Sequence, residues 1–193
     1  MREDRKNEII QATIRLIQDK GSHPDAITVR EICKEAGVGV GIINYYFESK
    51  DNLIAQCVQQ IIGNVIAHFG EVLAPWPTTS AMGRLKYAAN ATVTFLYGNE
   101  NISRISILSD LRNGRAGDNT EQTIAAYLPL VEAVCRERQS QRDAKQATVT
   151  MCMVLQGAFL RTERIQAELG IDMRNPEERK RYVDGLIDGL FEG

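Results

Sequence analysis

The sequence has few of the residues that mark catalytic or metal-binding proteins. It contains only two histidines, His23 and His68, and four cysteines, none of which forms a C-x-x-C pair. Distant histidines and scattered cysteines do not have the spacing of a zinc site. A glycine-rich phosphate loop and a serine in a nucleophile elbow are also missing. We therefore expect no enzyme, no metal and no cofactor.

Long apolar runs are missing as well. No run approaches the ~20 residues that a membrane-spanning helix needs. The N-terminal residues 1–6 are charged and do not form an apolar signal segment. We expect a cytoplasmic protein with buried, reduced thiols, no disulfides and no membrane partner.

The chain has little excess charge of either sign. Its net charge is −2, and residues 1–52 hold nine acidic and eight basic side chains. The basic field that usually marks a nucleic-acid-binding domain is therefore missing. Any DNA binding has to come from individually placed charges and from helix N-termini.

Helical periodicity, by contrast, extends over nearly the whole sequence. Apolar residues recur at helical spacing, as in Ile10, Ile14 and Ile17, and alternating strand patterns are nearly absent. Pro129 should kink or interrupt the helix that contains it. We predict an all-α protein of about nine helices, over residues 4–20, 29–36, 40–46, 50–74, 80–97, 100–113, 120–139, 142–169 and 176–191.

Residues 28–47 carry the functional prediction. Thr28 and Glu31 have the spacing of a capping box that opens a short helix, and Gly37–Gly39 separates it from a second one. Two short helices joined by a tight turn form a helix-turn-helix, whose second helix enters the major groove, although other helical hairpins share this arrangement. The second helix contains Gly41, which would let a DNA backbone approach closely.

Four elements follow one another in this segment: Ile27–Ile32, Ala36–Val38, Gly41–Ile43 and Tyr46–Leu53. Together, over about residues 5–54, they resemble the N-terminal signature of the TetR family of transcriptional regulators. The resemblance implies an N-terminal three-helix DNA-binding domain over residues 1–50. It also implies a helical-bundle domain over residues 51–193 that senses a ligand and dimerises.

The function implied by the resemblance is that of a DNA-binding transcriptional regulator, a repressor released from its operator by a small-molecule effector. Its partners would be double-stranded operator DNA, an effector and a second copy of the chain. The near-neutral N-terminal segment and the apolar second helix leave an alternative open. The alternative is a dimeric helical small-molecule-binding or interaction protein without operator binding.

The resemblance implies DNA contacts position by position. Arg30 matches a position that often contacts DNA, and Val40–Ile42 matches the start of the recognition helix. Tyr45 matches a position on the DNA backbone or a thymine methyl, and Lys50 matches a phosphate-contacting lysine. The full predicted DNA-binding set is Thr28, Arg30, Gly39, Val40, Gly41, Ile42, Asn44, Tyr45, Tyr46 and Lys50.

Two positions depart from the family pattern. Gly39 stands where the family usually has a Ser or Thr cap, so that cap is missing. Asn44 stands where a phosphate-contacting tyrosine is usual, and its carboxamide could bind a phosphate or pair with adenine.

The C-terminal domain carries no motif, so its sites are predicted from residue type alone. The effector pocket is expected among Phe69, Trp76, Tyr87, Phe95, Tyr97, Arg104, Tyr127 and Met151, although ordinary core packing or an ion pair would also explain these residues. The dimer interface is expected on the last two long helices, at Ala147, Leu155, Ala158, Phe159, Val183, Leu186, Ile187 and Leu190. The same residues could instead pack only within one subunit.

Overall fold

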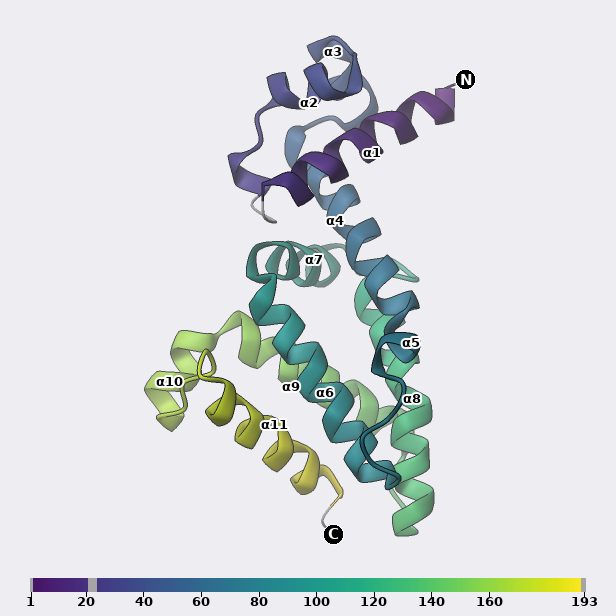
Figure 1. The fold of residues 1–193 in the computed structure, drawn as a ribbon, viewed down its shortest axis with the longest axis vertical. Helices are drawn as coiled ribbons and strands as arrows, with labels where there is room; N and C mark the ends of the chain where they lie inside the picture. The colour runs from purple at the N-terminus through teal and green to yellow at the C-terminus, as the bar shows by residue number, and fades with distance from the viewer. Residues whose placement is uncertain (1, 21–23, 192–193) are drawn as a thin grey trace. The chain divides into compact units, whose positions relative to one another are not determined.

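The protein is all-helical, as predicted. A computed structural model describes residues 2–20 and 24–191, so His23 lies outside the described residues, and no β-strand occurs among them. None of the described helices is both long and apolar enough to cross a membrane. The α-helices are α1 (Arg2–Asp19), α2 (Val29–Ala36), α3 (Val40–Phe47), α4 (Lys50–Ala67), α5 (Phe69–Leu73), α6 (Ala81–Gly98), α7 (Glu100–Asn113), α8 (Asn119–Arg138), α9 (Ala144–Leu160), α10 (Thr162–Leu169) and α11 (Pro176–Phe191) (Figure 1).

The described residues form eleven α-helices where about nine were predicted, because two long helices are broken. The helix expected over 50–74 breaks at His68, and the one expected over 142–169 breaks at Arg161. Both residues have non-helical backbone angles, φ −98° and ψ 7° at His68 and φ −117° and ψ 33° at Arg161. Apolar periodicity could not reveal these breaks, because the segment on each side keeps its own helical pattern.

Pro129 lies inside α8 and does not interrupt it. A proline in a helix leaves the carbonyl four residues earlier without its amide donor. That residue is Ala125, and both Ala125 and Pro129 are exposed. Water can therefore satisfy the carbonyl, and the helix continues through the proline.

By packing, the chain divides into two compact units. The first contains the described residues up to Val65 together with Asn99–Arg115, and the second contains Ile66–Gly98 and the described residues from Ala116 onward. In the first unit, α1 packs on α2 and α2 on α3. In the second, α6, α8, α9 and α11 surround a core that includes Leu85, Val131 and Ile187. The functional division after residue 50 stays a prediction.

The capping box at the start of α2 is confirmed. Thr28 Oγ1 accepts a hydrogen bond from the Glu31 amide at 3.3 Å, and the Thr28 amide donates to Glu31 Oε2 at 2.8 Å. Glu31 Oε1 also accepts from Lys20 Nζ at 2.7 Å, which ties the end of α1 to α2. The hydrogen bond from Lys20 and those from Thr28 lower the pKa of Glu31 from 4.5 to about 2.

We expect Glu31→Gln to lower the stability of the first unit at neutral pH, because it removes the charge that Lys20 and the Thr28 amide stabilise. A pKa depressed in the folded state stabilises the fold above pH 4.5, and this stabilisation is lost as the pH falls towards 2. Urea unfolding of both proteins should therefore show a stability difference at pH 6 that shrinks between pH 5 and pH 3. A constant difference over that range would contradict the ionic role of Glu31.

Candidate nucleic-acid interface

α3 is anchored by one face and exposed on the other. Ile43 and Phe47, four residues apart on the helix, are 1% and 2% exposed. On the opposite face Ile42 is 38% exposed and Tyr45 62%, and Val40 in the first turn is 53% exposed. A short helix held this way presents an apolar and aromatic surface outward, as a recognition helix needs.

The backbone amides in the first turn of α3 are not capped by a side chain. Gly39 precedes the helix in an extended conformation, with φ −80° and ψ 155°. It provides no side-chain hydrogen bond to the helix, so the Ser or Thr cap usual at this position is absent, as predicted. The Val40 and Gly41 amides therefore point from the positive end of the helix, where phosphates bind. A Cβ added at Gly41 would meet nothing within 4 Å. Internal packing thus does not explain why position 41 is a glycine.

Three consecutive aromatic rings connect the exposed face of α3 to the core. The Tyr45 and Tyr46 rings meet edge-to-face with centroids 5.1 Å apart, and the Tyr46 and Phe47 centroids are 6.2 Å apart. Tyr46 is half-buried between the two. The buried Phe47 ring therefore restricts the orientation of the exposed Tyr45 ring through Tyr46, which lowers the ordering entropy that a contact would cost.

The start of α4 and the start of α2 meet through Lys50. Lys50 Nζ donates to the Ile27 carbonyl at 3.1 Å, directly before the α2 cap. An ammonium group has three donors, so Lys50 can hold this carbonyl and still donate to a phosphate. Ser49 Oγ accepts from the Asn52 amide at 3.1 Å and so caps the start of α4.

The remaining predicted DNA-binding residues lie on α3 or in α2 and its cap. Arg30 is exposed in the first turn of α2, and Asn44 is exposed on α3. Thr28 is exposed too, but its hydroxyl donates to Glu31 Oε2 at 2.8 Å and accepts from the Glu31 amide. A phosphate contact by Thr28 would therefore compete with the capping box.

Sequence reasoning missed the turn that joins α3 to α4. Glu48 has φ 65° and ψ −39°, and the Ser49 amide donates to the Phe47 carbonyl at 2.7 Å. An amide bonded to the carbonyl two residues earlier, around a residue with positive φ, is a γ-turn of the rare, strained kind. Glutamate gives no signal of positive φ in a sequence, so this geometry could not have been predicted.

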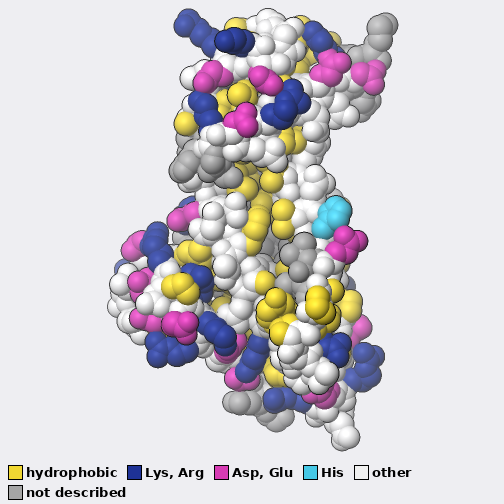
Figure 2. All heavy atoms as spheres, viewed as in Figure 1, with side chains coloured by type: hydrophobic (Ala, Val, Ile, Leu, Met, Phe, Trp, Pro, Cys, Tyr) yellow, Lys and Arg dark blue, Asp and Glu magenta, His cyan; other side chains and the backbone are white. Residues whose placement is uncertain are grey.

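Charges of both signs surround the interface. Figure 2 shows basic and acidic side chains interspersed over the face in view, as the near-neutral composition predicts. Several form exposed pairs, such as Arg15 with Glu35 at 3.2 Å and Arg5 with Glu8 at 2.8 Å. Part of the positive charge of the first unit is therefore paired with carboxylates.

The structure separates the predicted effector residues into several aromatic contacts. Within the second unit, the Phe69 and Tyr127 ring centroids are 5.5 Å apart, and those of Trp76 and Tyr87 are 6.2 Å apart. Tyr127 is buried, which raises the pKa of its phenol despite a 2.6 Å hydrogen bond with Thr92. The pocket stays a prediction.

Tyr97 belongs to a different cluster of the second unit. Its ring lies edge-to-face with Phe159 at 5.2 Å and 5.0 Å from the Arg179 guanidinium, and its hydroxyl bonds to Thr162 at 2.8 Å. Of the other predicted residues, Met151 is buried and Phe95 is half-buried. Arg104 belongs to the first unit, 4.0 Å from Glu100.

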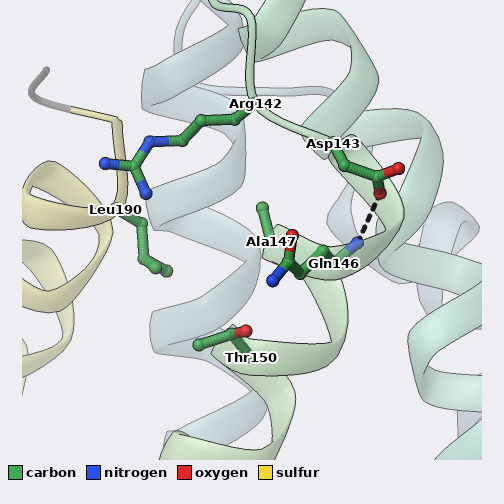
Figure 3. Close-up of a pocket in the computed structure, with 6 residues that line it drawn as sticks. All are labelled: Arg142, Asp143, Gln146, Ala147, Thr150 and Leu190. Atoms are coloured by element: carbon green, nitrogen blue, oxygen red, sulfur yellow. Dashed lines mark hydrogen bonds between the residues drawn. The ribbon is translucent and has the colours of Figure 1, made fainter.

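Most of the predicted dimer residues already lie inside their own subunit. Buried in the single chain are Ala147, Leu155, Ala158, Phe159, Val183 and Ile187. Leu186 and Leu190 on α11 are half-buried and keep surface for a partner. Beside Leu190 a cavity of about 170 Å³ opens between the end of α11 and the start of α9, lined also by Arg142, Gln146 and Thr150 (Figure 3). The dimer interface stays a prediction.

Burial was predicted for all four thiols and is confirmed for three of them. Cys33, Cys57 and Cys152 are buried and Cys135 is half-buried, and all four are free. Burial raises the pKa of Cys57 and of Cys152 to about 12. Both thiols are therefore protonated and unreactive at neutral pH.

Comparison with known proteins agrees with this geometry. Residues 9–57 match the family described as bacterial regulatory proteins, tetR family. The HTH-type transcriptional regulator BetI of Vibrio campbellii is 35% identical over 85 residues, which are 44% of this chain and 42% of that protein. BetI 1 of Chromohalobacter salexigens is 45% identical over 58 residues, 30% of this chain and 28% of that protein. The chain thus matches less than half the length of these curated relatives.

Solved structures share the fold over the whole chain. A TetR transcription regulator from Haloarcula marismortui has a TM-score of 0.60 at 18% identity and covers 98% of this chain and 97% of its own. RolR in complex with resorcinol has a TM-score of 0.63 at 14% identity, covering 97% of this chain and 88% of its own. At these identities the likeness concerns the fold alone.

The γ-turn makes Glu48 a position where glycine should be preferred. We expect Glu48→Gly to raise stability by about 1 kcal/mol, because glycine adopts positive φ without a Cβ clash. Glu48→Ala is the matched control, since it removes the same charge and keeps the Cβ. Urea unfolding that gives equal stabilities for the two variants would show that the turn stores no strain.

Proposed function

We propose that the chain is a member of the TetR family of bacterial regulatory proteins and acts as a DNA-binding transcriptional regulator, a repressor released from its operator by a small-molecule effector. The observation that carries this proposal is the exposed face of α3, held in place by the buried Ile43 and Phe47. This function would place the protein in the cytoplasm.

In the proposed complex, α3 enters the major groove. Val40 and Ile42 would contact thymine methyl groups, because aliphatic side chains have no hydrogen bonds to offer base edges. The Val40 and Gly41 amides and Lys50 would hold phosphates on either side of the groove and fix the register of the helix. Asn44 would supply the polar contact of this face, to a phosphate or an adenine.

The proposed protein acts as a dimer, so that two recognition helices reach half-sites about 34–36 Å apart, or a multiple of that distance. The partly exposed side of α11 favours a helix–helix interface, since Leu186 and Leu190 alternate there with the exposed Gly185 and Gly189. Glycines allow two helices to approach closely. An effector bound in the second unit would change the separation of the two DNA-binding heads and favour release.

We expect Tyr45→Ala and Lys50→Ala each to weaken binding to the chain's own upstream DNA by about tenfold, roughly 1.4 kcal/mol. Both remove a side chain that would contact the duplex while leaving the buried face of α3 intact. Gel shifts at several salt concentrations measure the effect, and the Lys50 variant should also have a shallower salt dependence.

Two substitutions outside the interface serve as controls. Leu111→Ala removes another large exposed side chain, on α7, and Lys145→Ala removes an exposed lysine from the first turn of α9. Both should bind DNA like the wild type. If the Tyr45 and Lys50 variants also bind like the wild type, the DNA-binding face is assigned wrongly. If neither the wild type nor any variant binds this DNA specifically, the alternative function is favoured, an interaction protein that does not bind an operator.

The proposed dimer interface can be tested at Gly189. A Cβ there meets nothing within 4 Å in the single chain, so Gly189→Arg should fold normally and block the approach of a second α11. Sedimentation at micromolar concentration should show a dimer for the wild type and a monomer for the variant. Gly98→Arg at the end of α6, where the space is also open, should remain dimeric. A dimeric Gly189→Arg variant would place the interface elsewhere.

A further inference from the structure

A polar cavity lies within the first unit, away from the exposed face of α3. Its volume is about 370 Å³, which falls in the range of small-molecule sites. One wall is the last turn of α3 and the γ-turn, Tyr46–Glu48. The others are residues of α4 between Asn52 and Gln60, and the end of α7 with Arg115 after it.

Carboxamides dominate the lining of this cavity. The lining carboxamides are Asn52, Gln56, Gln59, Gln60 and Asn113. The hydroxyls of Ser109 and Tyr46 add to them, and Asn113 Nδ2 donates to Ser109 Oγ at 3.2 Å. Each carboxamide both donates and accepts hydrogen bonds. The cavity therefore offers many hydrogen-bond donors and acceptors, and most of these groups are uncharged.

Two further hydrogen bonds hold part of this lining in place. Gln59 Nε2 donates to Asp110 Oδ1, which is buried on α7, and Gln11 Nε2 donates to Gln60 Oε1 at 3.2 Å. These bonds fix Gln59 against α7 and Gln60 against α1. The cavity is thus partly organised before any ligand arrives, which reduces the entropy that binding would cost.

The charges at the cavity balance each other. Glu48 and Arg115 are both exposed, and together they contribute no net charge. An anion such as a phosphate would favour a lining with several cations, and an apolar ligand would favour aliphatic walls. Of the lining, only Ala55 and the buried Phe47 are purely apolar.

From this chemistry we propose that the cavity is a binding site for a small uncharged polyhydroxylated molecule, a sugar or a polyol. Hydroxyl groups donate and accept as carboxamides do, so several can pair with the lining at once. The site is distinct from the effector pocket expected in the second unit. It does not depend on DNA binding, although its ligand would rest against the turn that carries α3.

The test measures binding of uncharged D-glucose, D-ribose and D-sorbitol at millimolar concentration by saturation-transfer NMR and calorimetry, on the full chain without DNA. Glucose 6-phosphate and benzoate are the charged and aromatic comparison ligands. Gln56→Leu removes one carboxamide, and Ala55→Trp fills the cavity from α4. Gln166→Leu, on an exposed position of α10, is the matched control, and thermal unfolding checks that each variant folds.

We expect at least one of the three uncharged compounds to bind, and Gln56→Leu to weaken its binding by about tenfold. Ala55→Trp should abolish it, and Gln166→Leu should leave it unchanged. Should Ala55→Trp fail to fold, Gln56→Leu decides alone. The proposal is overturned if none of the three binds, if Gln56→Leu binds as tightly as the control, or if glucose 6-phosphate or benzoate binds more tightly than all three.

Discussion

The burial of Ile43 and Phe47 is the contact on which the interface depends. α3 has eight residues, too few to be stable alone, and it begins without a side-chain cap. Its conformation is therefore maintained by the two side chains that enter the core of the first unit. Because they lie four residues apart on one side, the helix presents Ile42 and Tyr45, on its other side, to solvent. Val40 is exposed because it lies in the first turn of the helix.

Local devices then set the direction of that helix. The capping box fixes the start of α2, and Lys50 links the start of α4 to the carbonyl of Ile27. The γ-turn at Glu48 brings α4 directly after α3. In the proposed complex, affinity for a duplex would come from accurate placement of amides, aromatic rings and Lys50, rather than from a long-range field.

The core of the second unit contains many of the residues that the sequence suggests for a pocket or a dimer interface. Its aromatic residues form at least two contacts, Phe69 with Tyr127 and Tyr97 with Phe159. Most of the apolar residues that were expected to face a partner are already buried in the single chain, where α6, α8, α9 and α11 pack together. On α11, the half-buried Leu186 and Leu190 lie beside the exposed Gly185 and Gly189.

The sequence by itself determined the all-helical fold and the caps at Thr28 and Ser49. It also determined the outward face of α3, because all of these depend on side chains a few residues apart. Only the tertiary structure decided the breaks at His68 and Arg161, the positive φ of Glu48 and the burial of residues such as Phe159. It also brought Gln56 on α4 and Asn113 on α7 to one cavity. The physical reason is that burial and turn geometry depend on residues distant in sequence, about which local periodicity carries no information.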